Sequence, residues 1–223
     1  MLSDIVVLAA KDLRIELRSP SSAIGAITLG LIGLVVTGLA TGPDPARLRT
    51  IAPGLGWLAV LYAAMAVSER LDRIDRNDDA LSDLWLSVRD RRAIFAGKVL
   101  ALTLILWTIT LALLVAAIIL LNVEPTPAAV GLVPLAGLAS LALAAGAGLV
   151  TAVVGSSSQR VLLLPVVLLP LLAPALLAAS QATAALLGGH PDAALPWSGL
   201  LVAQAALFAG LGLLVYEAGA ALE

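Results

Sequence analysis

The side chains of this chain best placed to bind another protein lie in one charged segment, from Ser68 to Lys98. It holds fourteen of the twenty-eight charged side chains of the 223-residue sequence. Within it, Asn77-Asp78 offers an N-cap, and Asp79 follows in the first turn, where an acid suits the helix dipole. The short helix predicted here carries apolar side chains on one face, and an exposed apolar patch ringed by acids indicates protein docking. The predicted docking face comprises Asp78, Asp79, Leu81, Asp83, Leu84, Trp85 and Val88.

The alternative for this segment is a solvated loop, or one that rests on lipid headgroups. Charged loops between membrane spans usually have no further role. The apolar face on a capped helix favours docking over both alternatives.

No pattern for catalysis accompanies this segment. A phosphate-binding loop needs two glycines followed by Lys and a hydroxyl residue, whereas the nearest text, Gly97-Lys98-Val99, lacks the first glycine and the hydroxyl. The chain has no cysteine, which excludes disulfides, thiolate chemistry and Cys-ligated metals. We therefore expect no catalytic residue, no resident cofactor and no metal, and a chain that is not an enzyme.

The remaining ionisable residues outside the basic regions are scattered. The single histidine, His190, lies in a GGHPD turn and is expected to be solvated; it could ligate haem only if a partner supplied the rest of the site. Three acids are expected to be isolated loop or interface residues: Glu124, Asp192 and Glu217.

The composition is that of a membrane protein. Hydrophobic residues make up 61% of the chain, charged residues 13%, and the mean hydropathy is +1.05; a soluble domain is usually about 25% charged. Continuous apolar runs near the ~20 residues that a membrane helix needs predict helices rather than barrel strands. We predict one all-α transmembrane domain over residues 1–223, with spans at about 22–41, 51–68, 99–121, 128–154, 161–187 and 197–217.

The distribution of Lys and Arg predicts the orientation. Eleven of the thirteen lie in the N-terminal segment, the 69–98 loop and the 155–160 loop; only Arg47 and Arg49 lie on the opposite side. The positive-inside rule then places both termini and the 69–98 loop in the cytoplasm. The net charge of −2 indicates no nucleic-acid partner.

Within the predicted spans the only Asp, Glu, Lys, Arg or His is Glu217, the last residue of the sixth span. Such residues mark proton relays and ion paths in membranes, so a proton- or sodium-coupled carrier and an intramembrane hydrolase are disfavoured. If the protein moves a substrate, the energy must come from elsewhere. The predicted helix in the 69–98 loop would then be a coupling helix on which a separate ATPase acts.

Residues 2–18 predict an amphipathic helix in the plane of the membrane interface, with its cations near anionic headgroups. Asp12 and Glu16 lie one turn apart and are expected on its polar surface. The apolar stripe comprises Leu2, Ile5, Val6, Ala9, Leu13 and Leu17.

Two further patterns concern the bundle itself. Pro165, Pro170 and Pro174 lie in one predicted span and predict a kinked or locally unwound helix beside a cleft, because each proline removes a backbone donor. Small residues at helical spacing, in the pairs Ala144/Gly148 and Ala206/Gly210, indicate close helix packing.

Three stretches carry a likeness to a known family: the leader KDLRIELRS, the loop SERLDRIDRNDDALSDLWLSVRDRRAIFAGK and the proline-rich LLLPVVLLPLLAPALLAA. They resemble the haem exporter protein B (CcmB) family, the permease-type subunit of the cytochrome c maturation ABC complex. The resemblance covers nearly the whole length. The loop is shared more loosely with other ABC-2-type permeases. Those often have a Gly-x-Leu-Glu stretch and a proline after the Leu-Leu pair, where this chain has Asp79-Ala80-Leu81-Ser82-Asp83 and Val88.

The resemblance implies a set of partners and a location. The chain would form a homodimer within an A2B2 core with a CcmA-like ATP-binding subunit that carries the ATP. CcmC-like and CcmD-like membrane proteins and a CcmE-like haem chaperone would join it in the bacterial inner membrane. Haem would be the cargo of the complex and would not be bound by this chain, and ATP hydrolysis would serve haem transfer or release of the loaded chaperone.

Two alternatives stay open at this point. One is an ABC-2-type permease for another substrate, such as a lipid or drug, which the family-like leader and the three prolines disfavour. The other is a scaffold that assembles the haem-handling complex without transporting anything.

Overall fold

The computed structural model describes residues 2–42, 44–77, 91–154 and 160–220, and the regular structure in these ranges is entirely helical. The predicted all-α class is therefore confirmed. The helices, in chain order, are α1 (Leu2–Arg18), α2 (Ser21–Thr41), α3 (Pro45–Asn77), α5 (Arg91–Leu120), the 3-10 helix η1 (Pro127–Gly131), α6 (Leu132–Val154), α7 (Arg160–Leu187) and α8 (Pro191–Ala220).

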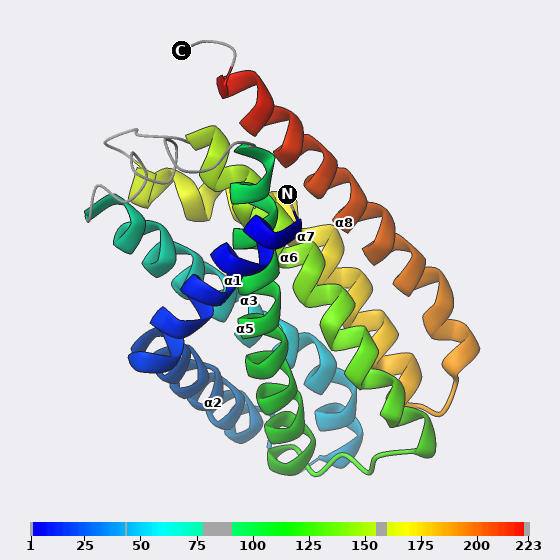
Figure 1. Ribbon diagram of the computed structural model, residues 1–223. Helices are drawn as coiled ribbons and strands as arrows, with labels where there is room; N and C mark the ends of the chain where they lie inside the picture. Colours follow the sequence, from blue (N-terminus) through cyan, green and yellow to red (C-terminus); the bar gives the residue numbers. More distant parts are fainter. Residues whose placement is uncertain (1, 43, 78–90, 155–159, 221–223) are drawn as a thin grey trace.

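Six of the described helices are long and apolar enough to cross a membrane: α2, α3, α5, α6, α7 and α8. This confirms the prediction of six transmembrane helices. Figure 1 shows them as one bundle, with α1 lying obliquely across α5 near one end. The helix predicted over residues 2–18 is also confirmed.

The bundle has an inner and an outer set of helices. In the apolar window of α3, 56% of the residues are buried, against 17% in α2 and 28% in α8. Helices α2 and α8 lie at opposite edges in Figure 1. Their outward side chains are large and apolar, as in Ile32 and Leu39 of α2 and Leu207 and Leu214 of α8. Such surfaces suit lipid, in which apolar side chains need no protein cover.

An aromatic side chain joins three helices near one end of the bundle. Phe95 of α5 is 2% exposed, and its ring packs against Gly212 of α8 so closely that any Cβ at this glycine would collide with it. A Cβ at Gly148 of α6 would lie 3.1 Å from the same ring. The ring of Tyr216 lies 5.4 Å from that of Phe95, centroid to centroid. Two glycines thus provide the space in which α5, α6 and α8 meet.

The two predicted small-residue pairs have different outcomes. Ala144 is fully buried and Gly148 faces Phe95 and Val99, so this pair does bring α6 close to α5. Ala206 and Gly210 are both exposed, and nothing lies within 4 Å of a Cβ built at Gly210. The second pair therefore packs closely against none of the described residues, because it lies on the outward face of α8.

A buried hydrogen bond joins α3 to α7. The indole Nε1–H of Trp57 donates to Oγ1 of Thr183 at 2.9 Å, and both side chains are about 1% exposed. The two residues are 126 positions apart in the sequence. This contact fixes the two inner helices relative to each other in a place where no water would satisfy either group.

Candidate functional site: the charged end of the bundle

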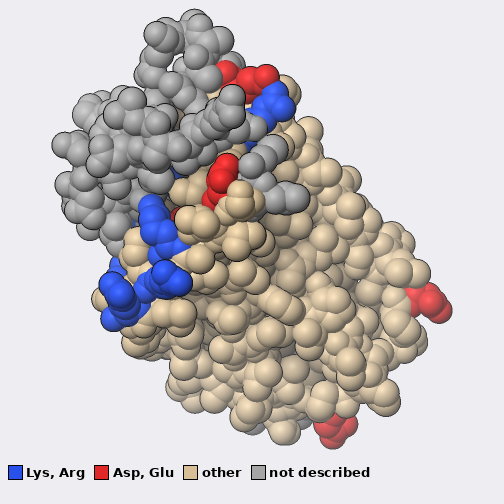
Figure 2. All heavy atoms as spheres, in the orientation of Figure 1, with Lys and Arg blue, Asp and Glu red and all other residues tan. Residues whose placement is uncertain are grey.

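The functional candidate is the end of the bundle where α1, the last turns of α3 and the first turns of α5 lie; we call it the charged end. Figure 2 shows Lys and Arg gathered there on the visible face, whereas the other end of that face shows separate acidic patches only. The basic residues of the charged end include Lys11, Arg14, Arg18, Arg70, Arg92 and Lys98.

The predicted docking face lies outside the described residues, since it falls between 78 and 88. Its two stems are described. Helix α3 continues without a break to Asn77, and α5 begins at Arg91. The chain therefore leaves one long helix and enters another within thirteen residues, 78–90.

Glu16 joins α1 to two other helices. Its Oε2 lies 3.0 Å from Nη1 of Arg70 on α3, and its Oε1 accepts the backbone N–H of Ala23, in the first turn of α2, at 3.2 Å. The side chain of Glu16 is 6% exposed and that of Arg70 20%. A carboxylate is costly to bury unless it is paired and hydrogen-bonded, and here it is both.

Asp12 is the second buried acid of α1. The residue is 3% exposed, and its Oδ1 lies 3.3 Å from Nζ of Lys11. It lines a cavity of about 40 Å³ together with Ser68, whose buried Oγ has no hydrogen-bond partner among the described residues. The other residues around this cavity are Lys98, Val99, Leu102, Ala144, Gly148 and Thr151.

The prediction that Asp12 and Glu16 lie on the polar surface of α1 was therefore wrong. Both acids face the bundle, because Arg70 supplies a buried partner for Glu16. The outward side of α1 instead carries Val6, Val7 and Leu17, all at least 60% exposed. Of the predicted apolar stripe, Ala9 is buried whereas Val6 and Leu17 face outward.

A second ion pair joins α5 to α8 at the charged end. Nη2 of Arg92 and Oε2 of Glu217 form a salt bridge, with both side chains about half exposed. The prediction that Glu217 is an isolated residue was wrong, because α8 brings it back to the start of α5. An exposed pair of this kind contributes about 0–1 kcal/mol.

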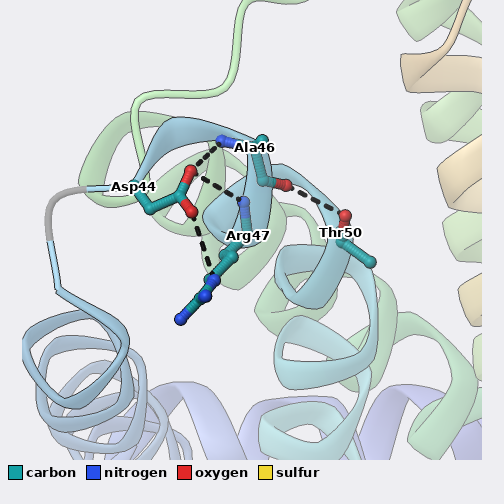
Figure 3. A network of polar contacts seen from close by, with 4 residues as sticks. All are labelled: Asp44, Ala46, Arg47 and Thr50. Atoms are coloured by element: carbon teal, nitrogen blue, oxygen red, sulfur yellow. Dashed lines mark hydrogen bonds and ion pairs between the residues drawn. The ribbon is translucent and has the colours of Figure 1, made fainter.

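At the opposite end, Asp44 caps α3 (Figure 3). Its Oδ1 accepts the backbone N–H groups of Ala46 at 3.0 Å and Arg47 at 3.5 Å, and its Oδ2 lies 3.2 Å from Nε of Arg47. The hydroxyl of Thr50 donates to the carbonyl of Ala46 at 2.9 Å. These contacts satisfy the first turn of α3, which is the role of an N-cap.

A larger cleft, of about 490 Å³, opens at this opposite end between α3, the segment after α5 and the end of α7. We expected a cleft beside the three prolines of α7, but the first α7 residue that lines this cleft is Ser180. Pro170 and Pro174 are exposed and do not line it. Helix α7 is continuous through all three prolines, and the kink stays a prediction. The cleft residues are Thr50, Pro53, Val123, Glu124, Ser180, Gln181, Ala184, Leu187 and Gly188.

His190 is exposed in the turn between α7 and α8, and Asp192 follows in the first turn of α8. Within the described residues no group of three or more His, Cys, Asp or Glu could hold a metal ion.

Comparison with known proteins gives one consistent family. The sequence model of the CcmB protein family matches residues 3–223. The heme exporter protein B of Pseudomonas aeruginosa is 31% identical over 231 aligned positions, covering 95% of this chain and 97% of the relative. That of Bradyrhizobium diazoefficiens is 30% identical over 204, covering 88% of each. That of Haemophilus influenzae is 33% identical over 91 residues, covering 41% of each.

Proposed function

This chain belongs to the CcmB protein family, and from that premise we propose that it is the membrane subunit of an ABC transporter complex that delivers haem for cytochrome c maturation. The observation that carries the proposal is the match of the family across residues 3–223, with relatives named heme exporter protein B aligned over most of their length. Haem is the cargo of the complex, and this chain holds no cofactor of its own.

The energy comes from a partner. A CcmA-like ATP-binding subunit binds and hydrolyses ATP and docks on the segment between α3 and α5, through the face that includes Leu84 and Trp85. Two copies of this chain and two of the ATPase form the core. CcmC-like and CcmD-like membrane proteins and a CcmE-like haem chaperone complete the complex, and this chain catalyses no reaction itself.

The complex lies in the bacterial inner membrane with the charged end of the bundle in the cytoplasm. Support for this orientation is the gathering of Lys and Arg at that end, which the positive-inside rule assigns to the cytoplasm. The outward apolar surfaces of α2 and α8 face lipid, and the cations Arg14 and Arg18 of α1 lie near anionic headgroups.

Purification of the chain from its native membrane in mild detergent tests the proposal. We expect an ATP-binding subunit and a haem-linked chaperone to elute with it. A matched purification of an unrelated six-span protein from the same membrane provides the control. Elution of this chain alone, with no nucleotide-binding partner, would overturn the proposal, and co-elution with an ATPase but a lipid or drug instead of haem would support another substrate.

Thiol labelling of intact cells checks the orientation, and the absence of native cysteine makes it a clean measurement. A cysteine introduced at Arg47 is expected to react with a membrane-impermeant maleimide, because Arg47 is 75% exposed at the outer end. A cysteine at Arg92 is expected to react only after the cells are permeabilised. Labelling of Arg92→Cys in intact cells would place the charged end outside and reverse the topology.

A further inference from the structure

Helix α1 touches both helices that carry the predicted docking segment. On the α3 side the contact is the buried pair of Glu16 with Arg70, seven residues before the end of α3 at Asn77. On the α5 side the contact is Gly97, seven positions into that helix from Arg91 counted inclusively. A Cβ at Gly97 would lie 2.8 Å from Cβ of Leu8 and 3.2 Å from the backbone oxygen of Ile5.

The two contacts are of different kinds. The ion pair is largely buried, since the side chain of Glu16 is 6% exposed and that of Arg70 20%, so replacing Glu16 removes a charge pair for which water is a poor substitute. The contact at Gly97 is a close approach of two backbones that only glycine permits. A Cβ at this position would collide with Cβ of Leu8 and with main-chain atoms of α1, neither of which can rotate away. The outward side of α1 presents Val6, Val7 and Leu17, which are exposed in the part of the chain that the structure describes.

We infer that α1 is a clamp that positions the ATPase-docking segment, with Glu16 as its positioning residue on α3 and Gly97 as its seat on α5. Neither residue belongs to the docking face. The clamp fixes the end of α3 relative to the start of α5, the two helices between which the docking segment lies in the sequence. The part of this inference that concerns the ATPase rests on the proposed function; the clamp itself does not.

Amide hydrogen exchange on the purified chain in lipid nanodiscs tests the clamp without any partner. Glu16→Gln is expected to raise the exchange rates of backbone amides in residues 70–77 and 91–97 at least about tenfold, since local opening becomes easier when a buried pair is broken. Gly97→Leu, which pushes α1 off α5, is expected to do the same.

Two matched controls separate this effect from general damage. Arg14→Gln removes a charge from the exposed side of α1, and Gly33→Leu adds the same side chain to a glycine of α2 that has nothing within 4 Å. Both controls are expected to leave exchange at the two stems unchanged. Unchanged exchange in Glu16→Gln and in Gly97→Leu would overturn the clamp.

The second measurement tests whether the clamp affects binding of the ATPase subunit. In nanodiscs, Glu16→Gln is expected to weaken binding of the ATPase subunit at least about tenfold in Kd, the equivalent of about 1.4 kcal/mol. Because the chain has no cysteine, Glu16→Cys with Arg70→Cys can be joined by a bifunctional thiol reagent. The tethered protein is expected to regain wild-type affinity, whereas the same variant without the reagent stays weak.

The outcomes are distinguishable. If the thiol tether between positions 16 and 70 abolishes ATPase binding, the proposed role of α1 in docking is overturned. The same holds if Glu16→Gln raises amide exchange in the two stems but leaves the Kd for the ATPase unchanged. If the wild-type chain binds no ATPase at all, the proposed function fails, and the exchange experiment still decides whether α1 clamps α3 to α5.

Discussion

Leu84→Asp combined with Trp85→Asp is expected to abolish co-purification of this chain with its ATPase partner. The physical reason is the loss of two large apolar side chains from the predicted docking face, with the gain of two charges beside Asp83. Truncating a buried anchor at an interface costs about 2 kcal/mol or more. Two such losses amount to about 4 kcal/mol, or roughly a thousandfold in Kd, which is enough to lose the partner during purification.

A matched control lies in the same segment. Ser82→Asp with Ser87→Asp adds the same two charges but keeps the apolar face, and this variant is expected to retain the ATPase. The measurement is affinity purification of the tagged chain followed by quantification of the partner and of its ATP hydrolysis. Assembly and hydrolysis at wild-type levels in the Leu84/Trp85 variant would refute the docking face, and the charged segment would then be a solvated loop.

Trp57→Ala is expected to lower the thermal stability of the detergent-solubilised protein more than any other single change considered in the inner helices. The indole is 1% exposed between α3 and α7, so its loss leaves a cavity and breaks the hydrogen bond to Thr183. Truncation of a buried Trp costs about 3–5 kcal/mol. For a chain of this size that corresponds to a fall in Tm of about 6–20 °C.

Two substitutions divide this cost into its parts. Trp57→Phe keeps most of the volume and loses only the hydrogen bond, which is worth about 0.6 kcal/mol on average in membrane proteins. Trp107→Phe removes an equivalent donor, whose bond to the carbonyl of Val133 is exposed, and is expected to shift Tm by less still. A Tm of Trp57→Ala within 2 °C of the wild type would show that α3 and α7 are not held by this contact.

The class and the span number follow from the sequence because lipid imposes simple rules. Each membrane helix must be about 20 residues long and mostly apolar, and Lys and Arg gather at one end. These rules act on each stretch by itself, so local patterns are sufficient. The six helices and the helical N-terminal segment were predictable on this ground.

The direction in which α1 faces was not predictable by the same route. Helical periodicity treats Asp12 and Glu16 as solvated, because acids rarely lie in a core. Here the partner of Glu16 is Arg70, which is 54 residues away in the sequence and on another helix. Periodicity contains no information on a partner so distant. A spacing rule could have noted the two acids at i and i+4, but not which helix they meet.

The contacts that join the inner helices could not be predicted from the sequence for the same reason. Phe95 fits against Gly212 and Gly148, and Trp57 against Thr183, over separations of tens of residues or more. Small-residue spacing correctly indicated Gly148 but gave equal weight to Gly210, which faces outward. In a chain with 19 glycines, the spacing alone does not distinguish a helix contact from a lipid-facing surface.

The contacts of the inward acids of α1 determine when this helix can dock during synthesis of the chain. A ribosome adds about 5–20 residues per second, so Arg70 is made roughly 3–11 s after Glu16, across the 54 residues that separate them. During that interval Arg70 is not yet available to Glu16, and the residue that α1 contacts on α5, Gly97, has not yet been synthesised. The N-terminal helix is therefore made first but docks late, after the nascent chain has delivered the third long helix to the bilayer.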